Sequence, residues 1–158
     1  MGVEIERKFL VVGDGWRDGP SGVAFRQGYL SGSAETTVRV RMAGEQAVLT
    51  IKGPSRGRRR LEFEYPLPPD DAAVMLAELC SGPLIEKDRY TRQVDGVEWV
   101  IDEFHGDNAG LILAEVELTR EDEAVTLPDW AGAEVSDDPR YYNAALTRNP
   151  FRSWPENR

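Results

Sequence analysis

Two scarce residue types exclude several kinds of site. The chain of 158 residues contains a single cysteine, Cys80, and a single histidine, His105. One cysteine cannot form a disulfide bond within the chain or build a thiolate cluster for zinc or an iron–sulfur centre. One histidine cannot supply a metal site that needs several imidazole ligands.

Long apolar segments and positive charge are also scarce. No apolar run approaches the roughly 18 residues of a membrane-spanning helix, and the N-terminal residues lack the pattern of a signal peptide. Asp and Glu number 28 against 19 Lys and Arg, a formal net charge of −9. Proteins that wrap nucleic acid usually need a basic surface. We therefore expect a soluble, cytoplasmic protein with no nucleic-acid partner and no membrane partner.

Alternation of apolar and polar residues with a period of two is the dominant pattern, and it predicts β-strands. We expect eight strands, near residues 2–12, 23–32, 35–43, 46–52, 57–66, 84–94, 97–104 and 111–119. The dipeptide Asp95-Gly96 is typical of a hairpin turn. Helices are expected over residues 70–80 and from Asp138 onward. The predicted architecture is one α+β domain, residues 1–158, with a mostly antiparallel sheet.

Charged residues repeat on one face of most of these strands. All three lysines of the chain lie on such faces. The residues on these faces are Glu4, Glu6, Lys8, Arg39, Arg41, Lys52, Arg58, Arg60, Glu62, Glu64, Lys87, Arg89, Asp102, Glu115 and Glu117. One interpretation is the solvated faces of a β-sandwich. The other is a closed barrel with a polar interior, in which each charge must be paired, bind a metal ion or meet a ligand.

The spacing of the carboxylates suits metal chemistry. Residues i and i+2 of a strand point the same way, about 7 Å apart. The pairs Glu4/Glu6 and Glu115/Glu117 could thus converge on hard divalent cations, which take oxygen ligands. The bases could clamp a polyanion, and together these groups are the parts of a phosphoryl-transfer site. No P-loop motif occurs, so side chains would have to hold the phosphates.

At these residues the sequence resembles the CYTH superfamily, the triphosphate tunnel metalloenzymes. Glu4-Ile5-Glu6-Arg7-Lys8 matches the Glu-x-Glu-x-Lys signature of that superfamily. Further matches follow in order: Arg39-Val40-Arg41, Thr50-Ile51-Lys52-Gly53, Arg60, Glu62-Phe63-Glu64, Glu86-Lys87-Asp88-Arg89-Tyr90 and Ala114-Glu115-Val116-Glu117. The resemblance implies a closed, eight-stranded antiparallel β-barrel, with a few peripheral helices, that binds triphosphates in its tunnel with Mg²⁺ or Mn²⁺.

The same resemblance implies a role for each charged residue. By position, the metal-binding set is Glu4, Glu6, Glu62, Glu64, Asp102, Glu115 and Glu117. The set that resembles the phosphate-binding bases is Lys8, Arg39, Arg41, Lys52, Arg60, Lys87 and Arg89. We expect Glu4, Glu6, Lys8 and Lys87 to take part in catalysis. No histidine lies in these motifs, so a glutamate or a metal-bound water would act as the base.

The implied activity is metal-dependent hydrolysis of a triphosphate, with inorganic triphosphate placed first. Thiamine triphosphatase activity, adenylate cyclase activity of class IV and a polyphosphate- or nucleotide-binding module without turnover remain alternatives. Only three residues precede Glu4, whereas cyclases of this superfamily usually carry residues, including a histidine, before the signature. The expected partner is a small triphosphate, and the chain could be a monomer or a homodimer.

Overall fold

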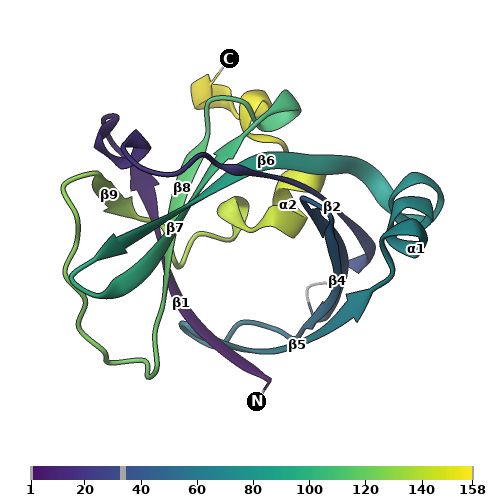
Figure 1. The fold of residues 1–158 in the computed structure, drawn as a ribbon, viewed down its shortest axis with the longest axis horizontal. Coiled ribbons are helices and arrows are strands. Elements are labelled where there is room, and N and C mark those ends of the chain that lie inside the picture. The colour runs from purple at the N-terminus through teal and green to yellow at the C-terminus, as the bar shows by residue number, and fades with distance from the viewer. Residues whose placement is uncertain (1, 33–34, 158) are drawn as a thin grey trace.

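The strands close into a barrel. The computed structural model describes residues 2–32 and 35–157. Its strands are β1 (Val3–Val11), β2 (Val23–Gly32), β3 (Thr37–Ala43), β4 (Gln46–Lys52), β5 (Arg59–Leu67), β6 (Ser81–Val94), β7 (Val97–Phe104), β8 (Ile112–Glu117) and β9 (Ala131–Glu134). In the described residues these form one antiparallel sheet in the order β5-β4-β3-β2-β6-β7-β8-β1-β9, and β5 also pairs with β1. Figure 1 shows the resulting ring. The predicted barrel of eight antiparallel strands is confirmed.

The closure between β1 and β5 is short, and we call it the seam. Among the described residues, three residue pairs join the two strands, from Val3↔Leu61 to Ile5↔Arg59. Backbone hydrogen bonds from Glu62 N to Gly2 O and from Glu6 N to Arg58 O flank these pairs. Further along, β1 pairs with β8 over Glu6–Leu10 and carries β9 on its far end. The sequence analysis did not predict β9, because its four residues Ala131–Glu134 show no alternation strong enough to indicate a strand.

The turns and the first helix follow local sequence closely. Asp95 and Gly96 both have positive φ, 50° and 76°, as the hairpin turn between β6 and β7 requires. Helix α1 (Pro69–Val74) begins with a proline at its first position and continues as a π-helical turn, Met75–Leu79. Residues 81–83, expected to follow the helix as a break, instead begin β6.

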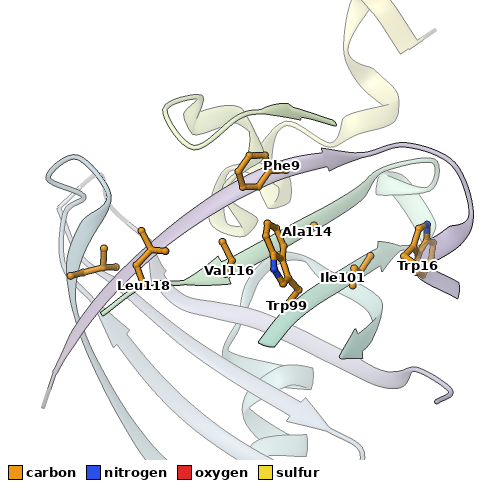
Figure 2. Close-up of a cluster of buried hydrophobic side chains, with 8 residues drawn as sticks. Phe9, Trp16, Trp99, Ile101, Ala114, Val116 and Leu118 are labelled. Carbon is orange, nitrogen blue, oxygen red and sulfur yellow. The ribbon is translucent and has the colours of Figure 1, made fainter. Parts of the chain in front are cut away.

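The outer faces of the strands form the hydrophobic core. On β1, β7 and β8 lies a cluster that includes Phe9, Trp99 and Val116, and Trp16, from the loop after β1, belongs to its end near Ile101 (Figure 2). Ala72 of helix α1 and Leu76 of the π-helical turn that follows it pack against β3 and β4. The core therefore lies outside the barrel wall, which leaves the inner faces of the strands free for polar groups.

The C-terminal segment covers one end of the barrel. Helix α2 (Asn143–Arg148) follows a 3₁₀ turn, Pro139–Tyr141, close to the expected second helix. Toward this end the inward residues change from charged to apolar, as in Lys87 to Ile85 on β6. The apolar ends pack against the C-terminal segment in one buried cluster: Ile85, Phe104, Leu111, Leu113, Tyr141, Leu146 and Trp154. The barrel is thus sealed at this end by an apolar cap.

The remaining helical segments are short. Four more 3₁₀ turns occur in the described residues, at Gly15–Arg17, Gly106–Asn108, Phe151–Ser153 and Pro155–Asn157. Among the described residues, no helix has the length and apolar character needed to cross a membrane.

Candidate active site

The barrel encloses a cavity of about 630 Å³. Thirteen of the fourteen residues that the sequence predicted for the site line it: Glu4, Glu6, Lys8, Arg39, Arg41, Lys52, Arg60, Glu62, Glu64, Lys87, Arg89, Glu115 and Glu117. Asp102 is the exception. They meet because each lies on an inward position of its strand, so the period-two pattern brings residues more than a hundred positions apart into one space.

Three neighbouring strands, β8, β1 and β5, carry the carboxylates. We call Glu4, Glu6, Glu62, Glu64, Glu115 and Glu117 the acidic wall. The register places Glu6 directly opposite Glu117, with Lys8 opposite Glu115. Burial, together with Glu115 and Glu4, raises the pKa of Glu6 to about 8. Burial also raises the pKa values of Glu4 and Glu117. The acidic wall therefore holds more negative charge than its own bases compensate.

Two lysines partly compensate this wall. Lys52 Nζ donates to Glu4 Oε1 at 3.0 Å and lies 3.2 Å from Glu62 Oε2. Lys8 Nζ lies 3.6 Å from Glu115 Oε1. Burial opposes ionisation of Glu115, but Lys8, Arg89 and Lys87 outweigh it and lower its pKa to about 2. Among the described residues Glu6 has no ion-pair partner within 4.0 Å.

The chemistry of the acidic wall fits a hard divalent cation. Its donors are all carboxylate oxygens, which such ions prefer. Burial and then the neighbouring carboxylates Glu115 and Glu4 raise the pKa of Glu6, and a bound cation would oppose both effects. In the part of the chain that the structure describes, no three acidic, histidine or cysteine side chains already stand together as a finished metal site. Lys52 lies between Glu4 and Glu62 instead. An ion at this wall would therefore compete with the lysine for the same oxygens.

The opposite side of the cavity carries the bases. We call Arg39 and Arg41 of β3, with Lys87 and Arg89 of β6, the basic wall. Burial, opposed by Asp102 and reinforced by Arg89 and Arg41, lowers the pKa of Lys87 to about 7. Burial and then Arg39 lower the pKa of Arg41 as well. These shifts are those of like charges held together away from water.

One donor of the basic wall is left without an acceptor. Arg39 is buried, and its Nη2 donates to Thr50 Oγ1 at 3.2 Å. Its Nε has no hydrogen-bond partner within the described part of the chain. An unpaired buried donor costs about 1–3 kcal/mol. An anionic ligand in the cavity would supply the missing acceptor.

Asp102 lies elsewhere than the sequence suggested. It does not line the cavity, and it is almost fully buried at 1% exposure. Its carboxylate accepts hydrogen bonds from Lys87 Nζ at 2.8 Å and from Arg89 Nε and Nη2 at 2.8 and 2.9 Å. Burial opposes ionisation, but these two bases hold the pKa of Asp102 well below its usual range. The geometry therefore makes Asp102 the support of two bases, with both oxygens already engaged.

Several lining residues were missed by the sequence analysis. Tyr142, Asn143 and Arg148 come from the C-terminal segment, where no strand periodicity points to the cavity. Lys8 Nζ lies 5.4 Å from the ring centroid of Tyr142. Tyr29 lies on the inward face of β2. The alternation of β2 does place Tyr29 on the inward face, but the site was predicted from charged residues, and Tyr29 carries no charge.

Comparisons with known proteins agree with this arrangement. The chain belongs to the CYTH domain family, whose model matches residues 2–142. An inorganic triphosphatase of Acetivibrio thermocellus is 46% identical over 156 residues, which cover 99% of this chain and 100% of that protein. An inorganic triphosphatase of Nitrosomonas europaea is 38% identical over 148 residues, 90% of this chain and 95% of that protein.

Solved structures share the fold. The crystal structure of the inorganic triphosphatase NE1496 has 35% sequence identity and a TM-score of 0.67, over 93% of this chain and 95% of that chain. The PH1012 protein of Pyrococcus horikoshii has a TM-score of 0.56 at 15% identity, over 75% of this chain and 80% of that chain. That second likeness supports the fold alone.

Proposed function

We propose that this protein hydrolyses inorganic triphosphate with the help of Mg²⁺ or Mn²⁺. One observation carries the proposal: an acidic wall and a basic wall face each other across a cavity of about 630 Å³. Divalent cations would bring positive charge to the acidic wall, and the polyanion bound with them would bring negative charge to the basic wall. The two relatives named as inorganic triphosphatases, which match nearly the whole chain, support the same substrate.

The walls divide the work of binding. We assign the metal-binding role to the acidic wall, and leave Asp102 out of it because its oxygens hold Lys87 and Arg89. We assign the triphosphate to the basic wall together with Lys8, Lys52 and Arg60. Arg60 is held in place because its Nε and Nη2 donate to Gly53 O at 3.1 and 2.8 Å. Arginines grip phosphate oxygens in pairs, whereas lysines act as point charges.

The reaction is an in-line displacement at the terminal phosphorus. The carboxylates of the acidic wall would hold a divalent ion, which would supply charge neutralisation and make a water molecule easier to deprotonate. Lys8 and Lys87, which approach the cavity from opposite sides, stabilise charge on the transferring and leaving groups. His105 contacts Asp88 at 3.0 Å and does not line the cavity. We assign the proton of the attacking water to a carboxylate of the acidic wall, and we place Glu4 and Glu6 in this catalytic group.

A substrate panel tests the proposal. Phosphate release is measured from tripolyphosphate, thiamine triphosphate and ATP, each with Mg²⁺, with Mn²⁺ and with EDTA. We expect tripolyphosphate to be hydrolysed fastest, EDTA to stop the reaction, and Glu6→Ala to abolish it. Glu98→Ala is the matched control, because Glu98 is an exposed glutamate on β7 outside the cavity. Faster turnover of thiamine triphosphate or ATP would reassign the substrate, and tight binding without release would indicate a binding module.

A further inference from the structure

The inner face of β2 carries no charge, although both neighbouring strands are basic. Its inward residues include Phe25 and Gln27, and both are buried. Gln27 pairs with Arg41 of β3, and Phe25 pairs with Lys87 of β6. The uncharged inner face of β2 therefore separates the two basic strands.

The Phe25 ring contacts three bases at once. The guanidinium carbons of Arg41 and Arg89 lie 4.8 and 4.9 Å from its centroid, and Lys87 Nζ lies 5.9 Å from it. The face of an aromatic ring attracts cations through its quadrupole. The ring thus holds the three cations near one another without supplying an opposite charge.

Two amides complete the same arrangement. Arg41 Nε donates to Gln27 Oε1 at 2.9 Å, and Gln27 Nε2 donates to Asn143 Oδ1 at 2.9 Å. Lys87 Nζ donates to the same Asn143 oxygen at 2.9 Å. Gln27 is fully buried, and Asn143 comes from helix α2 of the cap.

The direction of these hydrogen bonds is fixed by their two ends. A guanidinium and an ammonium can only donate. The amide of Gln27 must then turn its oxygen to Arg41 and its NH₂ group to Asn143, whose oxygen accepts from both sides. An aspartate in place of Asn143 could still accept both bonds, but it would add a negative charge beside Lys87. A glutamate in place of Gln27 would have no donor to offer Asn143.

We propose that Phe25, Gln27 and Asn143 are positioning residues, which fix Arg41, Lys87 and Arg89 in place for the substrate without adding a negative charge to that of Asp102. This inference rests on the proposed function, in which those bases bind triphosphate. It also gives the C-terminal cap a part in substrate binding, because helix α2 supplies one of the two amides.

Paired variants separate hydrogen bonding from charge. Gln27→Leu and Asn143→Ala remove hydrogen bonds. Asn143→Asp keeps its two acceptor contacts but adds a negative charge beside Lys87, and Gln27→Glu adds one beside Arg41 while it loses the donor to Asn143. Because an added carboxylate repels a bound anion and pairs with these bases, we expect the charged variants to raise KM for tripolyphosphate by about tenfold or more. We expect the uncharged variants and Phe25→Leu to raise KM severalfold, with kcat changed less in every case. Gln46→Glu, at an exposed glutamine on β4, is the control for added charge.

The outcomes separate this inference from the function on which it rests. Arg41→Ala is measured beside the variants: if its KM equals that of the wild type, the basic wall does not bind triphosphate and the proposed function fails. If Arg41→Ala raises KM while Gln27→Glu and Asn143→Asp behave like Gln46→Glu, the positioning role is overturned. Equal KM values for Asn143→Asp and Asn143→Ala would overturn the need for neutrality. Thermal melts identify any variant that does not fold. If Gln27→Glu does not fold, the Asn143 variants carry the test, because Asn143 is only partly buried.

Discussion

In the acidic wall and the basic wall of one cavity, the pKa values of two buried groups are shifted in opposite directions for the same reason. On the acidic wall, burial and neighbouring carboxylates raise the pKa of Glu6 to about 8. On the basic wall, burial and neighbouring bases lower the pKa of Lys87 to about 7, against the pull of Asp102. Burial and like charges thus shift Glu6 and Lys87 toward their neutral forms, whereas neighbouring ion pairs favour the charged forms of Glu115 and Arg89. The comparison shows that each wall gathers like charges away from water, so that each wall can attract a ligand of opposite sign.

The largest effect is expected from damage to the acidic wall. Glu115→Gln keeps the shape of the side chain and removes a carboxylate close to both Lys8 and Glu6. Since a catalytic metal ion contributes several kcal/mol, we expect kcat for tripolyphosphate to fall by about a hundred- to a thousandfold. Steady-state kinetics over a range of Mg²⁺ concentrations measures this. Glu103→Gln, at a glutamate of β7 that pairs with Arg17 outside the cavity, should keep wild-type activity.

A smaller effect, on binding, is expected from the basic wall. Arg39→Ala removes a base whose Nε lacks a partner among the described residues. One charge-assisted hydrogen bond is worth about 1.5–3 kcal/mol, so KM should rise about tenfold or more. Arg26→Ala, at an exposed arginine of β2, is the matched control. If Arg39→Ala lowered kcat and left KM unchanged, the division between a binding wall and a metal wall would be wrong.

The smallest effect is expected on stability, and it depends on pH. The pKa of Glu6 is about 8 in the folded protein and lower when unfolded, so the folded state binds more protons between these values. Ionised Glu6 therefore costs stability as pH rises through this window. In EDTA, Glu6→Gln should raise the melting temperature by several degrees at pH 9 and leave it unchanged at pH 4. If Glu6→Gln lowered the melting temperature at pH 9, ionised Glu6 would not destabilise the folded protein, and the prediction would be wrong.

The strands and most of the site could be predicted because both depend on local alternation. The alternation of each strand assigns Glu4, Lys52 and Glu115 to its charged face, and all three line the cavity. Asp102 has the same parity, but whether its oxygens face the cavity or two bases depends on side-chain packing across β6 and β7. Parity does not contain that information.

The C-terminal cap and the uncharged inner face of β2 could not be predicted in this way. Asn143 reaches the cavity from a helix whose place is set by packing of Leu146 and Trp154 against the barrel end. That is a long-range contact without a sequence period. Phe25 and Gln27 did lie on a face that alternation could reveal, but a search for charged residues does not detect residues whose contribution is to be neutral.

The seam between β1 and β5 makes the barrel a molecule with a built-in place to open. Three residue pairs close it, and Lys52 reaches Glu4 on one side and Glu62 on the other. Local opening is easiest where few hydrogen bonds must break. A ligand that binds or displaces Lys52 therefore acts on a side chain that bridges the two strands of the seam. We expect occupancy of the cavity and closure of the seam to be linked for this reason.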